Sequence, residues 1–192
     1  DASVSEIFAS LLSGGNLFIV DQKTKRTPDL FLQYMEEHAI EVATLPPVYV
    51  KTLDVKKLKS LKVLITAGEA ADKVKANDFL QYGAFRNAYG PTEASICATV
   101  YSVEKGASIE QDHVPIGRPI DQVEIYLLDE NQNRVSEGNI GEICIGGAGI
   151  ARGYLNRPEL TAEKFIVNPF DSRGESRLYR TNDLGRWLPD GN

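Results

Sequence analysis

The sequence predicts an α/β fold, in which a mostly parallel sheet flanked by helices is followed by a smaller β-rich lobe. In the first half of the chain, short apolar runs alternate with stretches of helical spacing, a pattern typical of parallel strands joined by right-handed helical crossovers. After about residue 113, short strand-like runs follow one another between Gly, Pro and Asn turns, as in all-β structure.

Composition limits the kinds of protein this chain can be. It has 192 residues, 42% of them hydrophobic, with 21 basic and 27 acidic side chains and a net charge of −6. These values are typical of a globular protein, and the acidic balance disfavours a nucleic-acid partner. No apolar run approaches the ~20 residues of a membrane helix. Cys97 and Cys144 lie in apolar stretches, which predicts buried free thiols and a reducing, cytoplasmic location.

The first predicted elements lie before residue 46. Ser3–Glu6 is a capping-box sequence followed by apolar residues at helical spacing, which predicts a helix that ends before Gly14. Leu17–Val20 is a short apolar run and is expected to form a strand. Pro28 opens a second amphipathic helix. Val42–Leu45 is the next predicted strand, closed by a pair of prolines.

The rest of the α/β lobe predicts a ligand site. Val63–Thr66 and Phe85–Ala88 are expected to be strands, with a helix over Ala70–Gln81 between them. The whole lobe then has a flavodoxin-like order of alternating strands and helices. Ligands of such open sheets gather beyond the carboxyl ends of the strands, and those ends carry unusual sequence here.

The second lobe is expected to be β-rich and barrel-like. Its predicted strands are residues 123–128, 141–145 and 177–180, with one helical insert at residues 157–165. The polar segment Glu104–His113 separates the two textures. The sequence therefore predicts an α/β lobe over residues 1–105 and a β-rich lobe over residues 113–192.

Five motifs occur in this sequence in the same order as in one known family. Asn87-Ala-Tyr-Gly-Pro-Thr-Glu93 resembles the signature of the adenylate-forming enzymes, most closely the amino-acid adenylation domains of nonribosomal peptide synthetases. Four further stretches resemble motifs of the same family, namely Asp1–Ser5, the glycine-rich Gly141–Tyr154, Arg157–Thr161, and Tyr179-Arg-Thr-Asn-Asp-Leu184. One such motif is weak evidence, whereas the ordered set is specific and spans the chain.

The resemblance implies a reaction and its partners. An adenylation domain activates an amino acid with ATP and Mg²⁺, forming an aminoacyl-AMP and pyrophosphate. It then passes the acyl group to the phosphopantetheine of a peptidyl carrier protein, in an assembly line that also contains a condensation domain. The family's phosphate loop is expected before Asp1, and its small C-terminal domain with the catalytic lysine after Asn192. The chain is thus expected to be an internal, inactive piece of the large N-terminal subdomain.

The resemblance also assigns nucleotide-binding residues. Tyr89 matches the aromatic residue that stacks on adenine, and Asp183 the carboxylate that accepts hydrogen bonds from both ribose hydroxyls. Thr92 and Glu93 match the catalytic pair that meets the α-phosphate and Mg²⁺. The remaining matches are Gly68, Glu69 and Ala70, in a loop that presents backbone to adenine, and Asn87 and Ala88 beside the tyrosine.

Structural interpretations of these residues stay open. Tyr89 can be an aromatic plug over the core, Thr92 and Glu93 an ordinary helix start, and Asp183 a turn aspartate. Asn182 departs from the family's glycine. Since asparagine tolerates a positive φ better than most residues, we expect the turn to survive.

The resemblance also implies an amino-acid pocket, and the family's pocket residues match nine positions of this sequence. They are Asp1, Ala2, Ser5, Thr44, Ile65, Ala67, Ala88, Ile96 and Cys97. Asp1 would pair with the substrate's α-ammonium, and the other side chains are uncharged and mostly small, which favours an aromatic amino acid such as tyrosine or phenylalanine. Because Ile96 and Cys97 are adjacent, a regular strand would point only one of them into the pocket, so we expect irregular backbone there. Ser5 can instead be only a helix cap.

Two other functions remain open at this stage. An acyl- or aryl-CoA ligase of the same superfamily would share most motifs, although its substrate has no α-ammonium for Asp1 to bind. A non-catalytic fragment that binds nucleotide or acts as an interaction module is the alternative from another class. Pyrophosphate exchange by the full-length parent separates an enzyme from such a binder, whereas the aspartate at position 1 argues against the CoA ligase.

Overall fold

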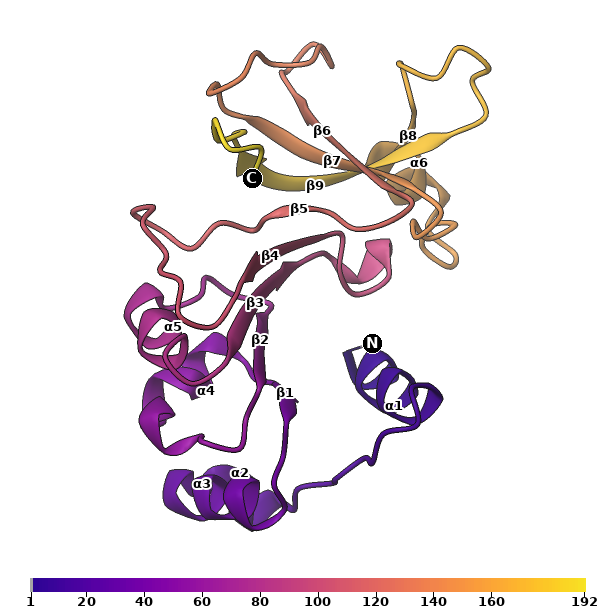
Figure 1. Cartoon of the computed structure of the whole chain (residues 1–192). Coiled ribbons are helices and arrows are strands. Elements are labelled where there is room, and N and C mark those ends of the chain that lie inside the picture. The colour runs from indigo at the N-terminus through magenta and orange to yellow at the C-terminus, as the bar shows by residue number, and fades with distance from the viewer. Residues whose placement is uncertain (1) are drawn as a thin grey trace. The chain divides into compact units, whose positions relative to one another are not determined.

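The computed structural model describes residues 2–192 (Figure 1). The chain divides into two compact units. The first contains the chain up to Ala88 together with Tyr101–Ile116, and the second contains Tyr89–Val100 and Gly117–Asn192. The division into lobes at residues 105 and 113 stays a prediction.

A parallel-rich sheet organises the first half of the chain. Strands β1 (Val42–Thr44), β2 (Val63–Ala67) and β3 (Ala84–Tyr89) pair in parallel. Strand β4 (Thr99–Val103) follows, and β5 (Arg118–Pro119) pairs antiparallel to it, giving the order β1-β2-β3-β4-β5. The predicted α/β class is confirmed.

Helices cover one face of β1–β3. They are α3 (Pro28–Glu37), α4 (Pro47–Thr52) and α5 (Lys73–Phe79), accompanied by the short 3₁₀ helix η1 (Val55–Lys57) (Figure 1). Leu64 of β2 and Phe85 of β3 are 0% and 1% exposed and belong to the same apolar core as Leu53 and Phe79. Side chains on the opposite face are less enclosed, and Val42 is 57% exposed.

Several boundaries differ from the sequence-based expectation. Leu17–Val20 is not a strand, because no strand pairs with it among the described residues; Ile19 is 83% exposed. Helix α2 (Gln22–Arg26) was not predicted and begins after Asp21, whose carboxylate accepts hydrogen bonds from two backbone amides. Helix α5 begins only at Lys73, because Asp72 caps it.

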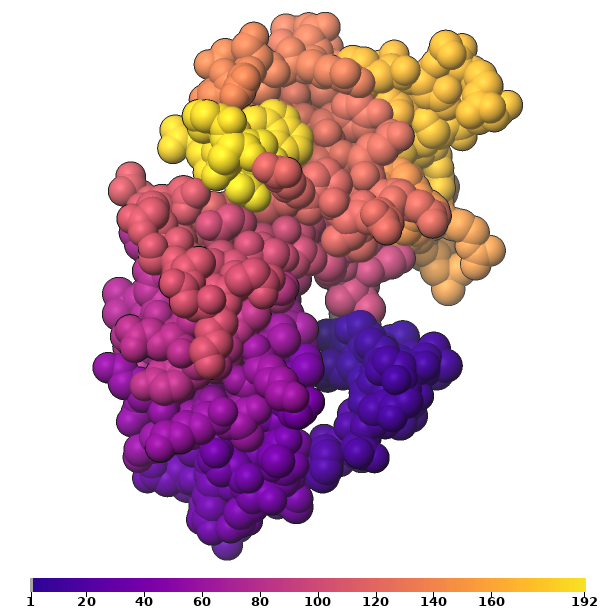
Figure 2. Space-filling model, viewed as in Figure 1, coloured from indigo at the N-terminus to yellow at the C-terminus, as the bar shows by residue number. Residues whose placement is uncertain are grey.

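Helix α1 (Ala2–Leu12) has no buried residue. It already includes Ser3, so the capping-box interpretation of that serine was wrong. Its apolar side chains lie at the surface, with Phe8 55% and Leu12 83% exposed; the helix belongs to the indigo segment in Figure 2. Helical periodicity therefore predicted the helix, but its apolar face is not covered by the described residues.

The second unit is built on an antiparallel sheet. Its strands are β6 (Val123–Leu128), β7 (Gly141–Gly147), β8 (Phe165–Val167) and β9 (Arg177–Gly185), in the order β6-β7-β9-β8. Helix α6 (Pro158–Lys164) is the predicted helical insert. The unit also holds the 3₁₀ helix η2 (Thr92–Ala94).

Two exclusions made from composition can be compared with the structure. Within residues 2–192, no helix has the length and apolar character that crossing a membrane requires. Cys97 and Cys144 are both free thiols. Cys144 is buried as predicted, whereas Cys97 is only half-buried, so the expectation of full burial was wrong for Cys97.

Burial at Leu64 makes a prediction about stability. Leu64→Ala removes a side chain that is 0% exposed and should lower the free energy of unfolding by about 2–5 kcal/mol. Val42→Ala, in the neighbouring strand at a 57% exposed position, is the matched control and should cost much less. Urea unfolding of both variants measures the difference, and equal losses would contradict this description of the core.

Candidate functional site

The Asn87–Glu93 motif leads into a tight loop that closes on itself. The Ala98 amide donates a hydrogen bond of 2.7 Å to the Tyr89 carbonyl, which brings the two ends of the loop together. Gly90 lies at this closure, where a Cβ atom would come within 2.6 Å of the Ala98 nitrogen and 2.7 Å of the Cys97 Cα. Only glycine fits such a close approach of two backbone segments. We call residues 89–98 the signature loop.

The backbone of the signature loop is irregular where we expected it. Ser95 and Ile96 both have positive φ, of 57° and 79°. For a β-branched residue such as Ile96 this conformation is strained, and strain of this kind costs on the order of 1–3 kcal/mol. These two positive φ angles interrupt, before Cys97, the alternation of side-chain directions that a regular strand would have.

A glycine-rich segment holds the signature loop in place. The Ala151 amide donates to the Glu93 carbonyl at 2.7 Å, and the Ser95 hydroxyl donates to the Gly149 carbonyl at 2.6 Å. Gly149 lies close to this loop, since a Cβ there would be 3.5 Å from the Ala94 carbonyl oxygen. These contacts fix the backbone that carries Thr92 and Glu93.

Tyr89 and Asp183 meet although 94 residues separate them in sequence. The Tyr89 hydroxyl donates a hydrogen bond of 2.6 Å to Asp183 Oδ2. Burial and this bond to a carboxylate both raise the pKa of Tyr89 above its usual value. The second unit therefore places an aromatic ring beside a carboxylate with two acceptor oxygens.

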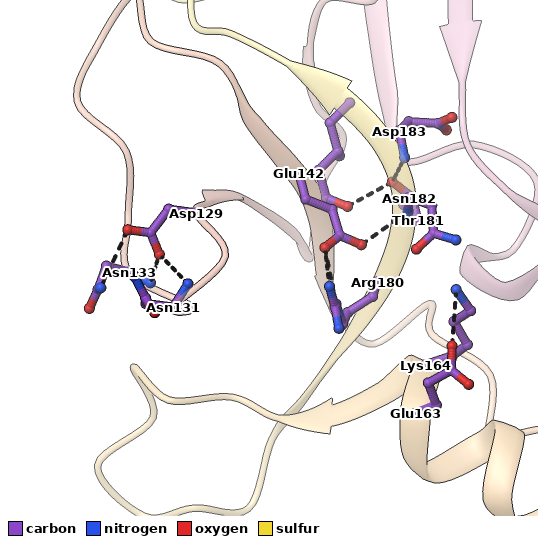
Figure 3. A network of polar contacts seen from close by, with 11 residues as sticks. Asp129, Asn131, Asn133, Glu142, Glu163, Lys164, Arg180, Thr181, Asn182 and Asp183 are labelled. Carbon is purple, nitrogen blue, oxygen red and sulfur yellow. Dashed lines mark hydrogen bonds and ion pairs between the residues drawn. The ribbon is translucent and has the colours of Figure 1, made fainter.

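The part of strand β9 that carries Asp183 is anchored to strand β7, where the register of the pair shifts between Glu142 and Cys144. Asn182 has a φ of 64°, the conformation predicted for the position where the family has glycine. The Thr181 hydroxyl donates to the Ile143 carbonyl at 2.7 Å and accepts from the Asp183 amide at 3.0 Å. One side chain thus joins this part of β9 to the neighbouring strand β7 (Figure 3).

Glu142 supplies a second anchor for the same part of β9. Its Oε2 accepts hydrogen bonds from Arg180 Nη2 at 2.6 Å and Nε at 3.0 Å, and its Oε1 accepts from the Asn182 amide at 3.1 Å (Figure 3). The hydrogen bonds to Glu142 raise the pKa of Arg180. Because the Glu142 carboxylate binds both the Arg180 side chain and the Asn182 backbone, it restricts how this part of β9 can move.

Two tyrosines surround the carboxylate of Glu93. The Tyr154 hydroxyl donates to Glu93 Oε1 at 2.5 Å, and the Tyr154 and Tyr179 hydroxyl oxygens are 3.3 Å apart. Partial burial raises the pKa of Glu93, but hydrogen bonding, with Tyr154 the largest contributor, outweighs burial and leaves that pKa below its usual value. Burial and the contact with Tyr154 raise the pKa of Tyr179.

Four predicted pocket residues share one face of the parallel sheet. Thr44 is in register with Ile65, and Ala67 with Ala88. Ile65 and Ala67 are two residues apart on β2, so their side chains point the same way. All four belong to the less enclosed face, near the carboxyl ends of β1–β3.

The other five predicted pocket positions do not belong to this sheet face. Asp1 lies outside the described residues. Ala2 and Ser5 lie on α1, where the Ser5 hydroxyl donates to the Ala2 carbonyl at 2.8 Å. Ile96 and Cys97 belong to the signature loop of the second unit.

The predicted adenine-side residues of the first unit differ in exposure. Gly68, Glu69 and Ala70 form an exposed turn after β2, and Gly68 has a φ of 90°. Asn87 is 4% exposed. Its amide nitrogen donates to the Pro115 carbonyl at 2.8 Å and its amide oxygen accepts from the Thr66 hydroxyl at 3.1 Å. The Asn87 side chain is therefore used in hydrogen bonds within the interior of the first unit.

Comparison with known proteins decides the family. The model of the AMP-binding enzyme family matches residues 1–155. The chain belongs to the AMP-binding enzyme family. It is 48% identical over 192 residues to gramicidin S synthase 1 of Brevibacillus brevis and 45% identical over 191 residues to tyrocidine synthase 1 of Brevibacillus parabrevis. All of this chain is covered in both alignments, but it spans only 17% of the length of each relative.

Two solved structures share the fold of this chain. Holo-PA1221, a synthetase protein that contains adenylation and carrier domains bound to a vinylsulfonamide inhibitor, aligns with a TM-score of 0.84 at 31% identity, over 100% of this chain and 34% of that one. The N-terminal subdomain of Klebsiella oxytoca NpsA in complex with 3-hydroxybenzoyl-AMSN aligns with a TM-score of 0.77 at 26% identity, over 99% of this chain and 49% of that one. The predicted resemblance is confirmed.

Three residues that organise the site were not singled out from the sequence. Glu142 and Tyr154 lie in the glycine-rich motif, and Tyr179 begins the motif that contains Asp183. Their membership in these motifs was the available signal. Their partners are 25 to 61 residues away, so local pattern does not show which contacts they make.

The positive φ of Asn182 gives a testable prediction. Asn182→Ala should lower the free energy of unfolding by about 1–2 kcal/mol, because alanine lacks asparagine's tolerance of the left-handed region. Asn182→Gly, which restores the family's residue, should cost less because glycine has no Cβ. Denaturant unfolding compares the two, and an Asn182→Ala protein as stable as Asn182→Gly would contradict the conformation described here.

Proposed function

We propose that the protein to which this chain belongs activates an amino acid with ATP, giving an aminoacyl-AMP and pyrophosphate. In the same proposal the acyl group then passes to the phosphopantetheine thiol of a peptidyl carrier protein, beside a condensation domain of one assembly line. Membership of the AMP-binding family supports the chemistry, and the synthetase relatives support the context. The free thiols are compatible with the cytoplasmic location that we propose for it.

The contact between Tyr89 and Asp183 carries the proposal. A nucleoside presents a flat base and two vicinal hydroxyl groups. An aromatic ring can stack on the base, and a carboxylate can accept from both hydroxyls because it has two oxygens. The two side chains are 2.6 Å apart at their polar atoms, which supports one nucleoside site that uses both.

The reaction needs positioning and charge neutralisation more than proton transfer. An oxygen of the substrate carboxylate forms a bond to the α-phosphorus, and the bond from that phosphorus to the bridging oxygen of pyrophosphate breaks. No general base is required, since the carboxylate is already ionised at neutral pH. We assign the hydroxyl of Thr92, which is exposed at the start of η2, to the α-phosphate.

The residues present fit Mg²⁺ held jointly with a nucleotide. Among residues 2–192 there is no cluster of three or more His, Cys, Asp or Glu side chains that could form a complete metal cage. Mg²⁺ is commonly bound through one or two carboxylates, with substrate phosphates and water as the other ligands. Glu93 supplies one carboxylate with hydrogen-bonding partners behind it, and bound Mg²⁺ would offset the charge of the triphosphate.

We further propose that the activated amino acid is aromatic. Thr44, Ile65, Ala67 and Ala88 present uncharged and mostly small side chains on one sheet face, which leaves volume for a large apolar substituent. The guanidinium of Arg86, on the same face, is bound to the Val103 carbonyl and the Glu104 carboxylate. The positive charge of Arg86 is therefore already paired, and it does not favour a substrate with a negatively charged side chain.

ATP–pyrophosphate exchange by the full-length parent protein, over a panel of amino acids, tests the proposed function. Exchange should depend on the added amino acid and be greatest with tyrosine, phenylalanine or a larger aromatic. Exchange with an aryl or fatty acid but with no amino acid would favour the acyl- or aryl-CoA ligase. Nucleotide binding without exchange would favour a non-catalytic module.

Ser5 provides a second test of the substrate. Ser5→Trp in the parent protein adds a large ring to the proposed pocket and should shift preference from tyrosine towards phenylalanine. Overpacking costs about 1–3 kcal/mol, which corresponds to roughly a 5- to 150-fold change in discrimination. Measuring kcat/KM for both amino acids in both proteins decides. If Ser5 only bonds to its own helix, the ratio will stay unchanged.

A further inference from the structure

We propose that Tyr154 is a positioning residue for the metal-binding carboxylate of Glu93, and that its hydroxyl holds Glu93 in the orientation that meets Mg²⁺. The proposal rests on the proposed function, which assigns Glu93 to the metal. Tyr154 itself has no assigned contact with nucleotide or amino acid. Its effect would be exerted through one hydrogen bond.

The geometry singles out this tyrosine. Its hydroxyl donates to Glu93 Oε1 at 2.5 Å, which is short, as is typical of a bond to an ionised acceptor. The bond from Tyr154 uses Oε1, and the Tyr179 hydroxyl and the charge of Lys164 also favour the ionised form of Glu93. An ionised carboxylate has about four lone-pair sites, so acceptor capacity remains for a cation. A ligand carboxylate restrained in this way by an outer hydrogen bond is the common arrangement at metal sites.

Packing fixes the ring that carries the hydroxyl. The Tyr154 ring meets Phe165 edge to face, with centroids 5.6 Å apart and an interplanar angle of 69°. Its backbone amide donates to the Thr161 hydroxyl at 2.9 Å, which ties the residue to α6. The neighbouring hydroxyl of Tyr179 lies 3.3 Å away. Tyr154 therefore has little freedom to release Glu93.

The other end of the bond is also held. The Glu93 carbonyl accepts from the Ala151 amide at 2.7 Å, three residues before Tyr154 in the chain. One short segment thus contacts both the backbone and the side chain of Glu93. Such a double contact orients the carboxylate before any ligand arrives, which is what a positioning residue must do.

The test compares two Tyr→Phe substitutions in the full-length parent protein. Tyr154→Phe deletes the hydroxyl bound to Glu93. Tyr126→Phe is the matched control, because the Tyr126 hydroxyl also bonds to a glutamate in the same unit, Glu124 Oε2 at 2.7 Å, to which we assign no role. Outer hydrogen bonds typically contribute 10- to 100-fold to metal affinity or activity. Tyr154→Phe should therefore raise the Mg²⁺ concentration for half-maximal exchange about 10-fold or more, whereas Tyr126→Phe should leave it unchanged.

A binding measurement separates this role from a structural one. Calorimetric titration with ATP, in Mg²⁺ and in EDTA, should show that Tyr154→Phe weakens binding about 10-fold only when Mg²⁺ is present. In a Glu93→Gln background the same substitution should have no further effect on Mg²⁺ dependence, because the two residues act through one interaction.

Each contrary result has a distinct meaning. A lowered melting temperature with an unchanged Mg²⁺ requirement would make Tyr154 merely structural and overturn the proposal. A tighter Mg²⁺ interaction in Tyr154→Phe would mean that the hydroxyl competes with the metal, which also overturns it. If wild type binds ATP with a Mg²⁺ requirement but shows no amino-acid-dependent exchange, the proposed function fails while the titrations still decide the role of Tyr154.

Discussion

The candidate site depends on the hydrogen bond that closes the signature loop, from the Ala98 amide to the Tyr89 carbonyl. With this bond in place, two backbone segments approach so closely that Gly90 cannot carry a side chain. The closed loop cannot remain a regular strand, and Ser95 and Ile96 adopt the positive φ angles that result. Strain of this kind persists only where the surroundings over-determine the conformation, and contacts from the glycine-rich segment supply that constraint.

In the second unit, two carboxylates bring together parts of the chain that are distant in sequence. One carboxylate, Asp183, lies in a part of β9 that Thr181 and Glu142 bind to β7, and it accepts a hydrogen bond from Tyr89. The other belongs to Glu93 and accepts from Tyr154. In both cases a tyrosine hydroxyl donates to an acidic side chain whose backbone is independently held. Backbone contacts thus fix where each carboxylate lies, and the tyrosine hydroxyl fixes how it is oriented. The chemical proposals rest on these two kinds of contact.

Sequence reasoning succeeded where local pattern determines structure. The short apolar run that forms β2 lies between two parallel neighbours, β1 and β3. The tolerance of Asn182 for positive φ is an intrinsic property of asparagine. Prediction from sequence failed where an element forms only if another segment pairs or packs with it. Leu17–Val20 looks like a strand but has nothing to pair with among the described residues. The two prolines after Leu45 predict only the end of a strand, but Pro47 also begins α4, because proline is favoured at the first position of a helix. The bond from Tyr154 to Glu93 spans 61 residues, beyond any local pattern.

The central claim is that Asp183, held beside Tyr89, accepts hydrogen bonds from the ribose of a nucleotide. The most direct measurement compares the affinities of ATP and 2′,3′-dideoxy-ATP for the wild-type parent protein and for its Asp183→Ala variant. Hydrogen bonds to charged groups contribute about 1.5–3 kcal/mol, so wild type should prefer ATP roughly 10- to 150-fold. The variant should bind the two nucleotides almost equally. The same preference for ATP in both proteins would contradict the account.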